Sequence, residues 1–178
     1  MAFMQKAVDK PFGFRPHGAI LRVGQYYKDA SAAAIYPGDA VILETDGGIA
    51  VAATSSIPII GAAVGYSAAS TEVVNFPVYD HPDQQFVVQD DSAGTGMTRA
   101  SEGSRCDITV TTGDTTTFQS LHELDSSTIN ATETTLAVQV IRLHPIEESS
   151  YATTTSEWRR WIVVFAEHLY QGANQAGI

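Results

Sequence analysis

The fold is decided by the stretch Tyr36-Pro-Gly-Asp-Ala-Val-Ile-Leu-Glu-Thr-Asp-Gly-Gly-Ile-Ala-Val-Ala52, which Ile59-Ile-Gly-Ala-Ala-Val-Gly-Tyr66 follows after a spacer of six residues. A Pro-Gly-Asp turn, a β-branched strand, an Asp-Gly-Gly hairpin and a second apolar strand succeed one another here. Such close alternation of turns and short strands predicts a small, tightly wound β-barrel. No catalytic motif interrupts the stretch, so we expect a protein that works through its surface and its assembly.

Short strands continue on both sides of this stretch. They are predicted over residues 20–23, 25–27, 40–44, 49–53, 59–66, 73–79, 85–89, 136–143 and 158–169, with a Gly113-Asp114 turn between two alternating segments. The close spacing of turn signals is typical of sandwiches and barrels. We therefore expect an all-β fold, a small β-barrel or sandwich over residues 25–178, preceded by an extended arm of residues 1–24. Small residues at 61–63 and at Gly65 predict the close approach of another backbone or subunit.

The N-terminal residues differ from the rest of the chain in charge and composition. Residues 1–28 carry five basic and one acidic side chain, whereas the other 150 residues carry five basic and 19 acidic ones. Pro and Gly in Lys10-Pro-Phe-Gly-Phe-Arg-Pro16 disfavour helix and sheet. We interpret the segment as a docking arm, with contact residues Phe3, Lys6, Lys10, Phe12, Phe14 and Arg15. The alternatives are a strap across the chain's own domain and chance clustering of the charges.

Composition excludes several classes of partner and chemistry. A net charge of −10 argues against nucleic acid, which needs clustered Lys and Arg. The single cysteine, Cys106, allows neither an intrachain disulfide nor a zinc cluster. The sequence contains no apolar run long enough for a signal peptide or a membrane span. We therefore expect no membrane partner, no cofactor and synthesis in a cytoplasm.

Motifs that could support chemistry are weak. Asp80-His-Pro-Asp83 places three possible metal ligands in four residues, but no second cluster completes a coordination sphere, and a solvated turn is the favoured interpretation. The five histidines are scattered through the sequence. A Ser-His-Asp triad can be assembled only in space, and Gly65-Tyr-Ser67 lacks the second glycine of a nucleophile elbow. We expect no catalytic, cofactor-binding or metal-binding residues, and no enzymatic activity.

Trp158-Arg-Arg-Trp161 has a different composition. On a strand the two tryptophans point to opposite faces, so one of them is expected in the core. The other, flanked by arginine, has the composition of an interface hot spot. A subunit interface is favoured over stacking on a carbohydrate or a nucleic-acid base.

Several stretches, taken in order, resemble the capsid decoration, or cement, proteins of tailed bacteriophages. They are Gly13-Phe-Arg-Pro16, Tyr26-Tyr27, Tyr36-Pro-Gly-Asp39, Ile60-Gly-Ala-Ala-Val-Gly65, Val78-Tyr-Asp-His-Pro-Asp-Gln-Gln-Phe-Val-Val-Gln89 and Trp161-Ile-Val-Val-Phe165. The order Gly-Asp-Ala-Val, Asp-Gly-Gly, Ile-Gly-Ala-Ala-Val is also similar to the compact β domain of lambda-type head decoration proteins, which implies a β-tulip-like barrel. The chain departs from the smaller members in its length and in its Phe- and Pro-rich arm.

The resemblance implies a virion structural protein, made in the host cytoplasm, on the outer surface of the expanded capsid. Its partner would be the major capsid protein, whose neighbouring subunits it clamps, commonly as a homotrimer. The self-association candidates are Ile60, Ala62, Val64, Trp158, Arg160 and Trp161. The alternatives are a head-fibre, connector or tail component, a carbohydrate-binding β-module and, with least support, a hydrolase.

Overall fold

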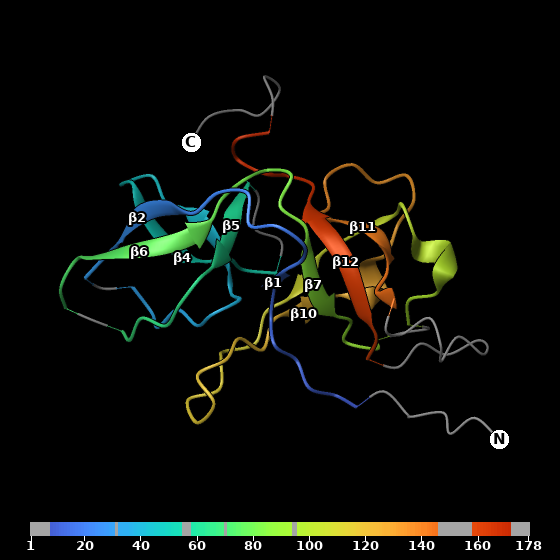
Figure 1. Ribbon diagram of the computed structural model, residues 1–178, viewed down its shortest axis with the longest axis horizontal. Helices are drawn as coiled ribbons and strands as arrows, with labels where there is room; N and C mark the ends of the chain where they lie inside the picture. Colours follow the sequence, from blue (N-terminus) through green and yellow to red (C-terminus); the bar gives the residue numbers. More distant parts are fainter. Residues whose placement is uncertain are drawn as a thin grey trace.

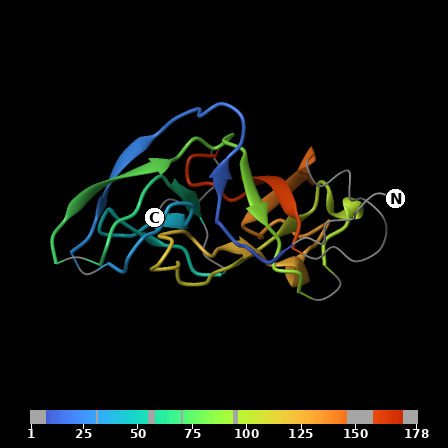
Figure 2. The ribbon, with the colours of Figure 1, turned by 60° about the horizontal axis from the view of Figure 1, so that its bottom comes forward.

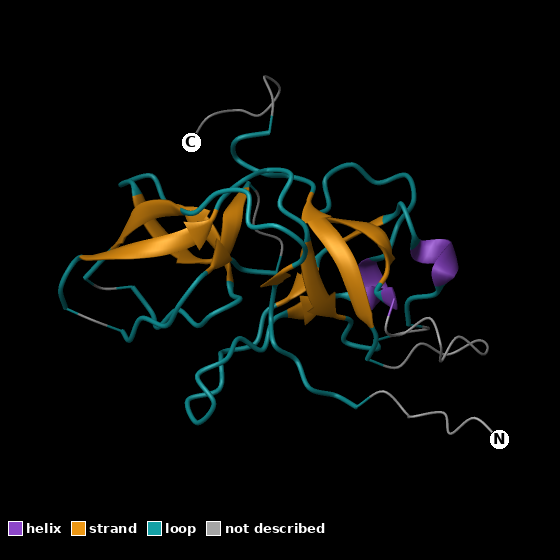
Figure 3. Ribbon diagram, in the orientation of Figure 1, coloured by secondary structure: helices purple, strands orange, loops and turns teal. Residues whose placement is uncertain are grey.

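The computed structural model describes residues 8–30, 32–54, 58–69, 71–93, 96–145 and 158–171. Within these ranges the fold is all-β, as the sequence predicts, and two lobes lie side by side along the long axis (Figure 1). Strands fill both lobes and long loops join them (Figure 3). In the part of the chain that is described, no helix has the length and hydropathy needed to span a membrane.

The first lobe is a closed five-stranded barrel of mixed pairing. Its strands are β2 (Gly24–Lys28), β3 (Ala40–Leu43), β4 (Gly48–Val51), β5 (Ile59–Ala63) and β6 (Val74–Tyr79), in the order β2-β4-β3-β5-β6. β2 closes the barrel because it pairs in parallel with β4 and antiparallel with β6. The hairpin between β3 and β4 forms where the sequence predicts it. Gly47 adopts φ +87° there, and Asp46 Oδ1 accepts the Gly48 N–H at 3.0 Å.

The second lobe is built on a five-stranded antiparallel sheet. Its strands, in order, are β1 (Arg15–Pro16), β7 (Phe86–Gln89), β12 (Arg160–Phe165), β11 (Val138–Leu143) and β8 (Arg105–Cys106). A separate two-stranded sheet joins β9 (Ile108–Thr109) to β10 (Glu123–Leu124). Short 3₁₀ turns, η1 (Arg99–Ser101) and η2 (Ser126–Thr128), lie in the connections. Figure 2 shows β1 beside β7, with the N-terminal segment continuing along this lobe.

One hydrophobic core is shared by the two lobes. It combines Phe86, Val140 and Phe165 of the sheet with Ala40, Ile59 and Ala62 of the barrel. A smaller cluster, which includes Val41, Ile49, Ile60 and Phe76, fills the barrel itself. The barrel is therefore anchored to the sheet by continuous apolar packing.

Residues 20–23 do not form the predicted strand. The Leu21 N–H donates to Gln84 Oε1 at 2.9 Å, so the loop after β6 holds this segment in place of a sheet ladder. Gly24 then passes so close to Asp80 that a Cβ would lie 2.3 Å from its carboxylate. The side chains of Ile20, Leu21 and Val23 are left exposed.

Candidate functional site

The N-terminal segment is tied to its own domain from Asp9 onward. The Lys10 N–H donates to Gln89 Oε1 at 3.3 Å, and the Phe14 N–H donates to Gly38 O at 2.8 Å. Arg15 and Pro16 then pair with Val87 and Phe86 at the edge of the sheet. We call residues 9–17 the strap. Two of the predicted docking residues, Phe3 and Lys6, lie outside the described residues.

Phe14 belongs to the core of its own chain. It is completely buried, and its ring lies 4.8 Å from that of Phe165 and 6.1 Å from that of Phe86. Gly13 beside it adopts φ +68°, and a Cβ there would lie 2.5 Å from Gly38 O. Phe14 is therefore unavailable to a partner. Of the other predicted docking residues, Phe12 is half-buried, whereas Lys10 and Arg15 are exposed.

Three of the predicted self-association residues are also buried within the chain. Ile60 lies inside the barrel, and Ala62 and Trp161 lie in the core that the two lobes share. The close approach predicted at Gly61 is made by β6, since a Cβ there would lie 2.0 Å from Tyr79 O. The remaining three, Val64, Trp158 and Arg160, are half-buried.

The structure assigns Trp161 to the core and shows how its polar edge is satisfied. Trp161 Nε1–H donates to Asp90 Oδ2 at 2.9 Å, and the Arg159 N–H donates to Asp90 Oδ1 at 3.2 Å. Burial raises the pKa of Asp90 to about 6, although these hydrogen bonds favour its charged form. The alternating pattern of the strand predicts that one tryptophan is buried, but it does not say which one.

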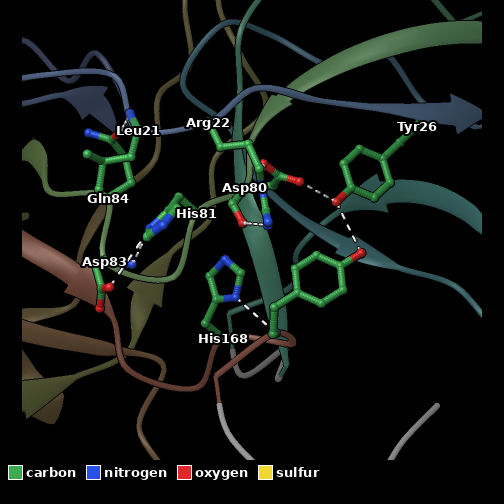
Figure 4. Close-up of polar contacts among 9 residues, drawn as sticks. Leu21, Arg22, Tyr26, Asp80, His81, Asp83, Gln84 and His168 are labelled. Carbon is green, nitrogen blue, oxygen red and sulfur yellow. Dashed lines mark hydrogen bonds and ion pairs between the residues drawn. The ribbon is translucent and has the colours of Figure 1, made fainter.

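An open hollow of about 420 Å³ lies between barrel residues and the segment after β12. Its lining side chains, Arg22, Tyr26, Asp80 and Tyr170, contact one another, and we call them the lobe clasp (Figure 4). Asp80 accepts from Arg22 Nε and from the Tyr26 hydroxyl, each at 2.7 Å. The two tyrosine hydroxyls lie 3.1 Å apart, and the Arg22 guanidinium lies 5.5 Å from the centre of the Tyr170 ring.

At Asp80-His-Pro-Asp83, two of the three possible metal-ligating side chains already accept hydrogen bonds. Both carboxylate oxygens of Asp80 are occupied by Arg22 and Tyr26. His81 Nδ1 accepts the Asp83 N–H at 3.1 Å. Burial, followed by the hydrogen bonds to Tyr170 and Asp80, raises the pKa of Tyr26, which therefore stays a donor. The arrangement ties the loop before β2, the barrel and the segment after β12 together.

A second histidine lies beneath the lobe clasp. His168 Nδ1 accepts the Tyr170 N–H at 3.0 Å, and His168 Nε2 is buried. Burial lowers the pKa of His168 to about 4, which keeps the ring neutral near pH 7.

The structure also brings together Asp39, Ser120 and His122, a set that the sequence does not reveal because it is assembled from separate loops. His122 Nε2 lies 3.5 Å from Asp39 Oδ1, and His122 Nδ1 accepts the Ala40 N–H at 3.2 Å. Ser120 Oγ accepts the His122 main-chain N–H at 3.1 Å. All three side chains are buried, and burial lowers the pKa of His122 to about 4. The set fastens β3 to the loop beneath the strap and presents no nucleophile to solvent.

Carboxylates of Asp29, Glu44 and Asp46 converge at the β3–β4 hairpin, with ligand atoms within 4.8 Å of one another. Glu44 and Asp46 are exposed, and Asp46 is already engaged by the turn through Gly48. Exposed acidic groups of this kind are solvated charge on the surface.

Two exposed aromatic rings lie together on the barrel side of the molecule. Tyr66 and Phe118 are 43% and 49% exposed, and their rings lie 4.8 Å apart. Tyr36, buried beneath them, lies 5.2 Å from Tyr66. Phe118 adopts φ +53°, an uncommon conformation for a bulky residue. Exposed aromatic pairs of this type are typical of interaction surfaces, and the sequence analysis did not single this pair out.

Comparisons with family models, with curated proteins and with solved structures found no match to the chain. The likeness to decoration proteins therefore remains an expectation drawn from the sequence motifs alone.

Proposed function

We propose that the protein is a virion structural protein that binds the outer surface of a phage capsid and cements neighbouring major-capsid subunits. The observation that carries this proposal is an N-terminal strap with exposed Lys10 and Arg15 on a body that is strongly acidic. Positive charge on the strap orients the strap toward a negatively charged surface, and that surface repels the acidic body.

The sheet architecture supports use in many copies. The barrel is closed, and the five-stranded sheet ends in β1 and β8, which have two residues each. Long free edges promote strand-to-strand aggregation, and this chain offers none in its described sheets. Copies can therefore crowd on a shell without polymerising, and a weak contact at each copy is multiplied by their number.

The docking segment that we propose lies ahead of Phe14. Phe14 is buried and Arg15–Pro16 pair with β7, so the segment that reaches the capsid comprises residues 1–10 with the exposed Arg15 side chain beside it. Aromatic Phe3 and basic Lys6 and Lys10 would supply anchoring and orientation. A trimer is the proposed oligomer, with Val64, Tyr66 and Phe118 as contact candidates.

The test is co-sedimentation of the chain with expanded heads that lack it, with bound copies counted against the major capsid protein. We expect saturable binding for the full chain. Deletion of residues 2–8 should abolish binding, because the deleted residues precede the contacts that hold the strap. Lys10→Glu with Arg15→Glu should weaken binding, since both side chains are exposed. Undiminished binding of the deletion variant would contradict docking through this segment.

The exposed pair Tyr66–Phe118 favours one second candidate, a carbohydrate-binding module in which these rings, in place of Trp158 or Trp161, form the stacking surface. Glycan-array binding that Tyr66→Ala removes would support it. Failure of every glycan to bind, with binding to heads intact, would exclude it.

A further inference from the structure

Gln89, at the end of β7, holds the start of the strap next to a carboxylate of the body. Its Nε2 donates to Asp9 Oδ1 at 3.2 Å and to Glu123 Oε1 at 3.1 Å. Its Oε1 accepts the Lys10 N–H at 3.3 Å. The buried side-chain amide of Gln89 therefore links residues 9 and 10 of the strap to β10. It also brings the carboxylates of Asp9 and Glu123 to the same NH₂ group.

The charged groups around Glu123 are mostly acidic. Asp9 faces it from the strap, and Asp90 and Asp91 approach it from the end of β7. Burial alone would raise the pKa of Asp91. Hydrogen bonds from Ala93, Ser126 and Thr109 have the larger combined effect and lower this pKa, so Asp91 is charged. The basic residue of the strap that directly follows Asp9 is Lys10, and its side chain is exposed to solvent.

Glu123 is the group of this set that is poised to change charge. Burial, followed by repulsion from Asp9, raises its pKa to about 7, against the hydrogen bond from Gln89. Opening the strap would remove Asp9 and admit water, and both changes would lower this pKa. A carboxyl whose pKa is higher in the closed state stabilises the closed state at low pH. That advantage is lost as pH rises from the open-state pKa toward about 7.

We propose that Asp9, Gln89 and Glu123 form a proton-closed latch, which holds the start of the strap on the body in mild acid and releases it near and above neutrality. Its consequence for docking rests on the proposed function, because release would free the residues ahead of Lys10 for the capsid. The latch itself is a property of the free chain.

The latch is tested with a nitroxide attached to Val8→Cys in the otherwise intact protein. The side chain of Val8 is exposed, and Cys106 is fully buried, so the introduced thiol is the one that reacts. Spectra are recorded from pH 5 to pH 8.5. We expect the mobile fraction of the label to rise with pH. The ratio of open to closed protein should increase by up to about tenfold for each pH unit by which opening lowers the pKa of Glu123.

Two latch variants and one control variant separate the latch from general effects of pH. Glu123→Gln keeps the hydrogen bond without the charge, so the label should stay immobile throughout. Asp9→Asn removes the repulsion at an exposed position, so it should lower the closed-state pKa of Glu123 and reduce the rise of label mobility with pH. The control is Asp83→Asn, which removes an exposed carboxylate in the loop after β6, and its label should behave as in the parent protein. A label mobility that ignores pH in the parent, or a transition that neither Glu123→Gln nor Asp9→Asn changes, would overturn the latch. This readout needs no heads, so its failure is distinct from a failure of capsid binding.

Discussion

At the scale of single residues, Phe14 decides how the N-terminal segment is divided. Its ring fills a site between Phe86 and Phe165, where truncation would leave a cavity. Phe14→Ala should therefore lower the free energy of unfolding by about 3–5 kcal/mol in denaturant titrations. Phe12→Ala, at a half-buried position, is the matched control and should cost clearly less. Equal losses for the two variants would show that the strap is not anchored by Phe14.

The buried histidines give a residue-scale prediction about pH. Burial lowers the pKa of His122 and of His168 to about 4, below the ordinary value of 6.5. The unfolded chain therefore takes up protons first, so the stability that these rings contribute is complete above pH 6.5 and is lost as pH falls toward 4. Ring signals of both residues in NMR spectra of the native protein should stay constant down to about pH 5. Titration of either ring near pH 6.5 would contradict its assigned environment.

At the scale of elements, Gly61 sets the packing of β5 on β6. It adopts φ +150°, and a Cβ would lie 2.0 Å from Tyr79 O, a main-chain atom that cannot move without breaking the barrel. Gly61→Ala should destabilise the protein by about 3 kcal/mol or more, and the thermal midpoint should fall. Gly65→Ala is the control, since a Cβ there meets no atom within 4 Å. A Gly61→Ala variant as stable as the parent would contradict the close packing of β5 on β6.

Most strands could be predicted from local pattern, but their partners could not. β3, β4, β5 and β6 each begin within one residue of the predicted start, because turn residues and apolar alternation mark them locally. The parallel pairing of β2 with β4, which closes the barrel, joins segments that no local signal links. The lobe clasp and the Gln89 bridge likewise depend on residues far apart in sequence. Residues 20–23 have the composition of a strand, but no strand in the described part of the chain pairs with them.

At the scale of the whole molecule, the shared core predicts cooperative unfolding. Ala40, Ile59 and Ala62 of the barrel pack in the same cluster as Phe86 and Phe165 of the sheet. Calorimetry should show one transition, with the calorimetric and van't Hoff enthalpies in agreement. Two separated transitions would mean that barrel and sheet fold independently.

The central claim, docking of the N-terminal segment on a phage capsid, is tested most directly by counting copies bound to expanded heads for the full chain and for the chain lacking residues 2–8. Docking through this segment predicts saturable, high-copy binding by the full chain and no binding by the variant that lacks residues 2–8, while calorimetry shows that this variant still folds. Absence of binding by the full chain, or equal binding by a folded deletion variant, would contradict it.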